Sequence, residues 1–214
     1  MDFKRKILLF IIILLSSIKV LAKEDTTPRK PKDPQLTQLR DPDAKYGKVI
    51  LNKQKRAEFK THGPTQINLS EISGTASLNG PAEINSSIIK TLELHGALTC
   101  FDTQLHNANI TGVVSLERTK ISKNITVYGV MSANNSIIDN IIANSSKVIL
   151  DNCIVHNLTV IGDIAYPHHR PIVELRGATT ISGSIKFVDT EGHVQTFGVN
   201  TSVNNIENGT TSQG

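Results

Sequence analysis

The sequence is poor in the residues from which most active sites and sugar-binding platforms are built. Its 214 residues include no tryptophan, two cysteines and 4% aromatic residues. The acidic residues of the repeated region are scattered, and no Ser/His/Asp spacing, glycine-rich phosphate loop or Cys-x-x-Cys motif is present. These absences argue against catalysis and against nucleic-acid binding. We therefore expect a protein that is not an enzyme and that has no cofactor and no metal.

The sequence does contain a repeat. A glycine returns every 16 or 17 residues, and apolar residues recur two and four positions to either side of it. Such alternation is typical of short strands with inward and outward side chains. A fixed period with one apolar pattern per unit indicates coils that bury their apolar faces against neighbouring coils. The repeat is marked by Gly63, Gly80, Gly96, Gly112, Gly129, Ser145 and Gly162.

The period predicts the architecture. One unit of 16–17 residues fits three short strands and three corners, which make a narrow triangular coil. We predict an all-β fold, a single-stranded parallel β-helix that we expect to be right-handed. Roughly seven or eight coils, stacked about 4.8 Å apart, would make a rod of roughly 35 Å.

Two further columns belong to this prediction. Small side chains nine residues before the marks would let the chain turn sharply and hydrogen-bond along the axis, and asparagines such as Asn85, Asn140 and Asn157 would form ladders at nearby corners. The small residues are Ser87, Thr103, Ser136, Cys153 and Thr180. Eight residues before the marks we expect an inward apolar column of Ile72, Ile88, Ile121, Ile137 and Ile154, with Leu105 one step out of phase.

Distance along the stack separates two pairs of reactive residues. Cys100 and Cys153 lie in different columns about three coils apart, roughly 14 Å, whereas a disulfide needs Cα atoms within about 7 Å. We therefore predict two buried free thiols. His106 and His156 share a column but are also about three coils apart, so they cannot share a metal ion.

The ends of the chain differ in composition from the repeat. A basic start precedes an apolar run of about 12 residues, and small residues before position 23 suit cleavage after Ala22. An uncleaved membrane anchor is the alternative, although spanning takes about 20 apolar residues. We predict a signal peptide over 1–22, a disordered basic linker over 23–44, an N-terminal cap over 45–62, a β-solenoid over 63–194 with a loop insertion at 165–171, and a C-terminal cap and flexible tail over 195–214.

Charge is distributed unevenly along the exported chain. Residues 23–60 carry eleven Lys and Arg against six Asp and Glu, whereas residues 61–214 carry eight against twelve. The basic segment is either a solvated leader or a contact for anionic lipid, polysaccharide or the acidic face of another subunit. We expect self-association and a cell-surface or polysaccharide partner, with no nucleic acid and no transmembrane segment after signal cleavage.

The loop insertion at 165–171 holds the only cluster of ligand-binding residue types. Tyr166, His168, His169 and Arg170 lie together there. Loops that project from rigid scaffolds often carry function, so these four are the candidate ligand contacts. An exposed polar loop without a ligand is the alternative.

The short coil with a corner glycine resembles the bactofilin-type polymer-forming β-solenoids. Segments 112–119 and 123–129 carry this likeness, and segments 180–187 and 191–194 look like parts of uncharacterised exported repeat proteins of gammaproteobacteria. The resemblance covers about residues 67–194 and implies end-to-end polymerisation. Bactofilins lack a cleaved signal, so their cytoskeletal role does not carry over.

These observations favour an exported structural or interaction protein in the periplasm, on the cell surface or secreted. The β-solenoid would be a rigid, non-enzymatic scaffold that self-associates through its ends. The alternative is a carbohydrate-binding or carbohydrate-degrading β-helix, which would need clustered acids or aromatics on one face. Glu83 and Asp102 are the one acidic pair that adjacent coils would bring near each other.

Overall fold

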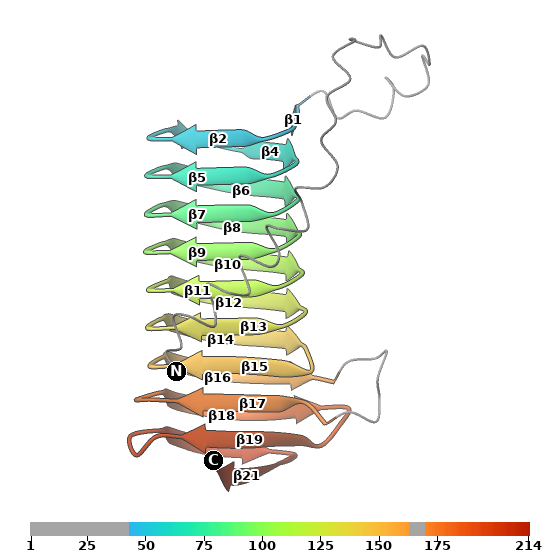
Figure 1. Ribbon diagram of the computed structural model, residues 1–214, viewed down its shortest axis with the longest axis vertical. Coiled ribbons are helices and arrows are strands. Elements are labelled where there is room, and N and C mark those ends of the chain that lie inside the picture. The colour runs from blue at the N-terminus through green and yellow to red at the C-terminus, as the bar shows by residue number, and fades with distance from the viewer. Residues whose placement is uncertain (1–42, 163–169) are drawn as a thin grey trace, which may run out of the picture. The chain divides into compact units, whose positions relative to one another are not determined.

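The computed structural model describes residues 43–162 and 170–214. Their regular elements are all β-strands, and the strands stack in parallel as a β-solenoid of about ten turns (Figure 1). The fold class is therefore the predicted one, with more turns than the seven or eight expected. Nowhere in the described chain is there a helix long and apolar enough to cross a membrane.

Two parallel sheets form the walls of the solenoid. The long-strand sheet contains β1 (Lys45–Tyr46), β3 (Lys55–Arg56), β4 (Phe59–His62), β6 (Glu71–Asn79), β8 (Ile88–His95), β10 (Gln104–Thr111), β12 (Lys120–Tyr128), β14 (Ile137–Asn144), β16 (Ile154–Ile161), β18 (Thr180–Val188) and β20 (Ser202–Glu207). The short-strand sheet contains β2 (Val49–Asn52), β5 (Thr65–Asn68), β7 (Ala82–Asn85), β9 (Leu98–Phe101), β11 (Val114–Glu117), β13 (Met131–Asn134), β15 (Lys147–Asp151), β17 (Ile172–Arg176), β19 (Gly192–Phe197) and β21 (Gly209–Gln213).

The third corner of the triangle is a bend inside each long strand. Near the start of the stack this bend is a break, because β3 and β4 are separate strands that both pair with β6. In later turns the strand continues through the bend, and the pairing register shifts there, for example between Ile72 and Thr75. The nine-residue strands β6, β12 and β18 carry one residue more than the eight-residue strands β8, β10, β14 and β16.

This variable bend makes part of the predicted apolar column wrong. Ile88, Ile137 and Ile154 are 52%, 49% and 54% exposed, and their neighbours Ile89, Ile138 and Val155 point inward instead. The inward position lies a fixed two residues after the small column, whereas its distance to the following glycine changes with the length of the bend. The remaining inward columns are buried as predicted, because strand alternation sends every second side chain into the core.

The glycine corner joins each long strand to the next short strand. From Gly63 to Gly129 the marked glycines have φ between 131° and 149°, a conformation that other residues rarely adopt. Their backbones also stack closely, so a Cβ on Gly112 would overlap the carbonyl oxygen of Gly96. Glycine is therefore required twice over, by backbone conformation and by space.

The second corner joins each short strand to the next long strand and carries the small column. Ser136 is representative: its hydroxyl donates to the Asn134 carbonyl (2.8 Å) and accepts the Thr119 N–H of the preceding turn (3.1 Å). The predicted hydrogen bonding along the axis is confirmed. The prediction placed Thr180 in this column, but Thr179 occupies it, and Thr179 Oγ1 accepts the Cys153 N–H (3.2 Å). Buried Ser70 and Thr119, which the prediction omitted, complete the column.

Asparagine ladders and buried thiols also follow the prediction. Asn85 Nδ2 donates to Asn68 Oδ1, and Asn157 Nδ2 donates to Asn140 Oδ1, each at 3.0 Å. Both cysteines are free and buried, and burial raises the pKa of each thiol.

The repeat extends beyond the predicted limits at both ends. Residues 45–62, which we expected to form a cap, form solenoid strands that pair in register with β4, β5 and β6. Residues 202–213, which we expected to form a cap and flexible tail, form β20 and β21 on the last turn. Polar residues take some inward positions of these outer turns, such as Arg56 in register with Ile72 and Thr211 in register with Val194, which obscures the repeat in the sequence.

Candidate functional site

The predicted ligand-contact loop is only partly described. Tyr166, His168 and His169 lie outside the described residues. Arg170 is exposed, and its Nη2 lies 2.8 Å from Glu191 Oε2 in an ion pair. The structure therefore places this arginine against the next turn of the stack.

A charged cluster that the sequence did not reveal lies on the outer face of the short-strand sheet. The Glu174 side chain is only 8% exposed, and its two oxygens each lie 2.5 Å from Lys147 Nζ or Arg176 Nη2. Burial alone would raise the pKa of Glu174, but hydrogen bonds and charges from Lys147 and Arg176 outweigh it and hold the pKa below 4.5. The cluster joins the turn before the insertion to the turn after it. No sequence signal marks it, because the insertion hides the register between Lys147 and Glu174.

The other acidic residues are engaged separately. Asp102 accepts two bonds from Arg118, at 2.7 and 3.2 Å, whereas Glu83 accepts one from Asn85 at 2.8 Å. Glu83 pairs in register with Thr99, so Asp102 lies three residues further along its turn. Each of the two carboxylates therefore has its own hydrogen-bond partner, and they share none.

Histidines likewise contact hydroxyl groups of neighbouring turns. His106 Nδ1 lies 2.7 Å from Ser122 Oγ, and His156 Nδ1 lies 3.0 Å from Ser182 Oγ. Among residues 43–162 and 170–214, no group of three His, Cys, Asp or Glu side chains could hold a metal ion.

Two of the exposed aromatic rings among the described residues pair with arginine, whereas Tyr46 stacks on His62 and Tyr128 is 50% exposed. The Arg118 guanidinium lies 3.8 Å from the centre of the Phe101 ring, and Arg176 lies 5.7 Å from that of Phe197. A sugar ring would have to displace these cations before it could stack on the same faces.

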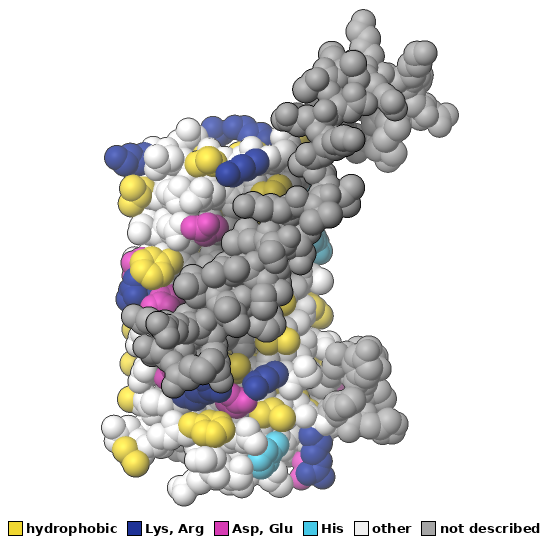
Figure 2. All heavy atoms as spheres, in the orientation of Figure 1, with side chains coloured by type: hydrophobic (Ala, Val, Ile, Leu, Met, Phe, Trp, Pro, Cys, Tyr) yellow, Lys and Arg dark blue, Asp and Glu magenta, His cyan; other side chains and the backbone are white. Residues whose placement is uncertain are grey.

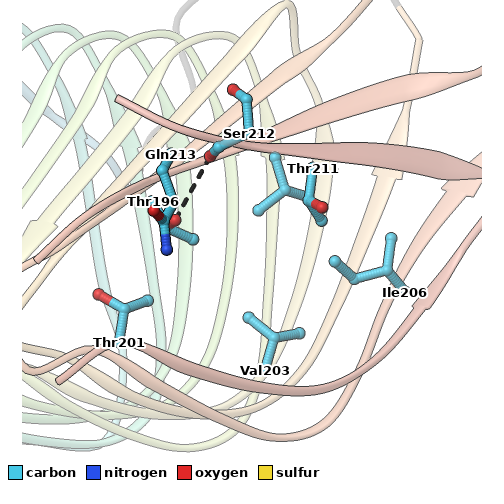
Figure 3. Close-up of a pocket in the computed structure, with 8 residues that line it drawn as sticks. Thr196, Thr201, Val203, Ile206, Thr211, Ser212 and Gln213 are labelled. Carbon is cyan, nitrogen blue, oxygen red and sulfur yellow. Dashed lines mark hydrogen bonds between the residues drawn. The ribbon is translucent and has the colours of Figure 1, made fainter. Parts of the chain in front are cut away.

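The last turn surrounds a hollow at the end of the stack. Figure 3 shows its lining from β19, β20 and β21, and its volume is about 470 Å³. Val203 and Ile206 continue the inward columns of Ile181 and Ile185 but are only partly buried. The hollow is lined by Val194, Thr196, Thr201, Val203, Ile206, Thr211, Ser212 and Gln213.

Each end of the stack also presents the edge of a sheet. Within the described residues, β2 pairs only with β5 and β21 pairs only with β19. We call the outer edges of β2 and β3 with the surrounding lysines the N-terminal face, and the outer edges of β20 and β21 with the hollow the C-terminal face. An unpaired edge is a template on which another strand can pair.

No family model, curated protein or solved structure matches this chain. The two faces and the insertion are therefore interpreted from their own geometry and chemistry.

Proposed function

We propose that this protein is an exported, non-enzymatic scaffold, a rigid β-solenoid that self-associates through its ends. The observation that carries the proposal is the pair of strand edges at the two faces, which are unpaired within the described residues. Parallel strands on an open edge continue readily into another chain, because main-chain hydrogen bonds do not depend on side-chain identity.

The sides of the solenoid support a structural role. Small, polar and asparagine side chains there bond to their own neighbours in the stack, as at Asn85 and Ser136. Side chains already satisfied in this way hold the turns in register and leave few groups to bind a ligand. Export is proposed from the basic start and apolar run of residues 1–22. The destination would be the periplasm, the cell surface or the medium.

The carbohydrate alternative would be favoured by clustered carboxylates or open aromatic faces. Glu83 and Asp102 have separate partners, Asn85 and Arg118, and the Phe101 ring is covered by Arg118. We therefore retain the scaffold as the proposed function.

Light scattering over a range of concentrations tests the proposal, with the full chain purified after export. We expect the mean mass to rise with concentration. Thr211→Lys should suppress this rise, because Thr211 points towards the hollow and a lysine there would be buried by an added turn. Thr99→Lys is the matched control, since Thr99 is exposed on the outer face of a mid-stack strand, away from both ends. A constant monomeric mass for the unmodified chain would contradict the proposal.

A further inference from the structure

We infer that copies of this protein associate head to tail, the C-terminal face of one copy adding to the N-terminal face of the next. This inference rests on the proposed self-association and adds its polarity and its register. The occupant of the hollow at the C-terminal face is then the first turn of a second copy. β2 of the second copy would continue the short-strand sheet beyond β21.

The register follows from an unbroken column on the outer face of the short-strand sheet. One residue from each short strand belongs to it, from Ile50 on β2 to Ser212 on β21. Continuing the ladder places Ile50 of the second copy beside Ser212, and Val49 and Leu51 of the second copy over Thr211 and Gln213. The column is Ile50, Gln66, Glu83, Thr99, Ser115, Ser132, Ile149, Glu174, Gln195 and Ser212.

Charge opposes the meeting of two N-terminal faces. Residues 43–62 hold five lysines and Arg56 against Asp43 and Glu58, and Lys45, Lys48 and Lys53 are exposed. Figure 2 shows Lys and Arg side chains gathered at this end of the stack. Like charges repel each other across an interface, so the N-terminal face favours a partner surface that is negatively charged or uncharged.

The C-terminal face has that character. After Lys186 the chain contains no lysine or arginine, and it contains Asp189, Glu191 and Glu207. Glu207 lies on the outermost long strand, where it forms an ion pair with Lys186 at 3.7 Å. Glu191 is already paired with Arg170. The face is therefore weakly acidic, and the lysines of a second copy would find acceptors there.

The hollow argues against the meeting of two C-terminal faces. Such a contact would set two hollows of about 470 Å³ against each other. Val203 and Ile206 share the lining with hydroxyl and amide side chains, and a symmetric contact would leave this space without protein atoms packed against it. The first turn instead brings the inward column of Val49 and Leu51 to the hollow. A head-to-tail contact between unlike faces does not close on itself, so it produces filaments.

Cysteine cross-linking of the full chain under a mild oxidant tests the polarity. Ile50→Cys with Ser212→Cys should give a ladder of dimers, trimers and longer species on a non-reducing denaturing gel. Parallel neighbours lie about 4.8 Å apart, within reach of a disulfide. Cys100 and Cys153 are 1% and 0% exposed, so they do not compete.

Matched variants make the result specific. Ile50→Cys with Gln66→Cys should cross-link within one copy, because these residues are in register, and it verifies the geometry. Ser115→Cys with Ser212→Cys uses the same column in mid-stack and should give no ladder.

Charge reversal tests the electrostatic part of the inference. Lys48→Glu with Lys53→Glu should weaken association about fivefold or more, whereas the mid-stack pair Lys90→Glu with Lys120→Glu should not.

The outcomes separate this inference from the proposed function. Dimers from Ser212→Cys alone or from Ile50→Cys alone would overturn the polarity and leave self-association standing. Large particles in scattering without a ladder from the double variant would show lateral association and overturn the head-to-tail contact. Monomers in both measurements would overturn the proposed self-association itself.

Discussion

Between Gly63 and Gly129 both loop corners of a turn use positive φ, but they make different demands on the sequence. At the glycine corner φ lies between 131° and 149° from Gly63 to Gly129, and successive backbones stack too closely for a Cβ. At the second corner φ lies between 46° and 51°, in the left-handed helical region. That corner accepts Lys53, Leu69, Ser86, Asp102, Arg118, Asn135 and Asn152.

The contrast shows which part of a solenoid can be recognised from its sequence. The left-handed helical region costs an ordinary residue about 1–2 kcal/mol, which the hydrogen bonds of the following small column offset. From Gly63 to Gly129 the glycine corner offers no such tolerance, so it leaves a visible mark every 16 or 17 residues there. Ser145 takes the next mark, where φ is not positive. The repeat can therefore be recognised in the sequence from the glycine corner, because there is no room for a side chain there.

The largest expected effect comes from adding a Cβ at the glycine corner. Gly112→Ala should lower the free energy of unfolding by about 3 kcal/mol or more, because the Cβ overlaps the Gly96 carbonyl and φ is unfavourable. Ser86→Ala at the other corner is the control and should change stability by less than about 1 kcal/mol. Chemical denaturation followed by circular dichroism measures both, and equal effects would refute the contrast between the corners.

The two cysteines provide the next comparison. Cys100→Ser should cost about 1–3 kcal/mol, because Cys100 lies in the apolar core and a hydroxyl there would be poorly satisfied. Cys153→Ser should be nearly neutral, because Cys153 Sγ donates to the Asp151 carbonyl (3.3 Å) in a column otherwise built of serine and threonine. The same denaturation experiment decides, and an equal loss at both positions would contradict the role of the small column.

The charged cluster of Lys147, Glu174 and Arg176 joins two neighbouring turns at the point where the insertion interrupts the glycine corner. Glu174→Gln should cost about 1–2 kcal/mol at pH 7, less than for a fully buried pair because Lys147 and Arg176 are partly exposed. Since the folded-state pKa of Glu174 is below 4.5, its contribution is present above pH 4.5 and is lost as the pH falls through the lowered value. The difference in free energy of unfolding between the unmodified protein and Glu174→Gln should therefore disappear in acid.

A pH series of thermal unfolding checks this, with Glu117→Gln in the exposed pair with Arg118 as the control. The control should have the smaller effect, because solvent screens an exposed pair. A Glu174→Gln deficit that persists unchanged at low pH would show that the cluster acts through packing alone.

The smallest expected effect is the relief of mild strain at the second corner. Leu69→Gly, at φ 49°, should change stability by less than about 1 kcal/mol. Glycine relieves the left-handed conformation but loses more entropy on folding. Thermal unfolding measures the shift, and a loss of several kilocalories would mean that the Leu69 side chain itself holds the corner.

The parts of the fold that could be predicted are those that the glycine corner and strand alternation mark in the sequence. Glycine spacing and strand alternation predicted the class, the coil length and most of the core. They failed at Ile88, Ile137 and Ile154, because the bend in the long strand varies by one residue and no residue type marks it. Residues 45–62 and 202–213 continue the strand pairing, which polar residues at some of their inward positions, such as Arg56 and Thr211, conceal in the sequence.

The candidate sites were less predictable. Arg170, which we selected as a ligand contact, forms an ion pair with Glu191 that the sequence did not reveal, and its role as a ligand contact stays a prediction. The Lys147–Glu174–Arg176 cluster depends on a register that resumes across the insertion, which sequence spacing cannot show. The basic first turn was visible as charge, but its position on an open sheet edge required the structure.

Negative-stain imaging of the purified full chain tests the central claim most directly. The account predicts unbranched filaments one solenoid wide, whose lengths grow with protein concentration. Single rods of one uniform length at every concentration would contradict it, because both ends of the stack would then be closed to further copies.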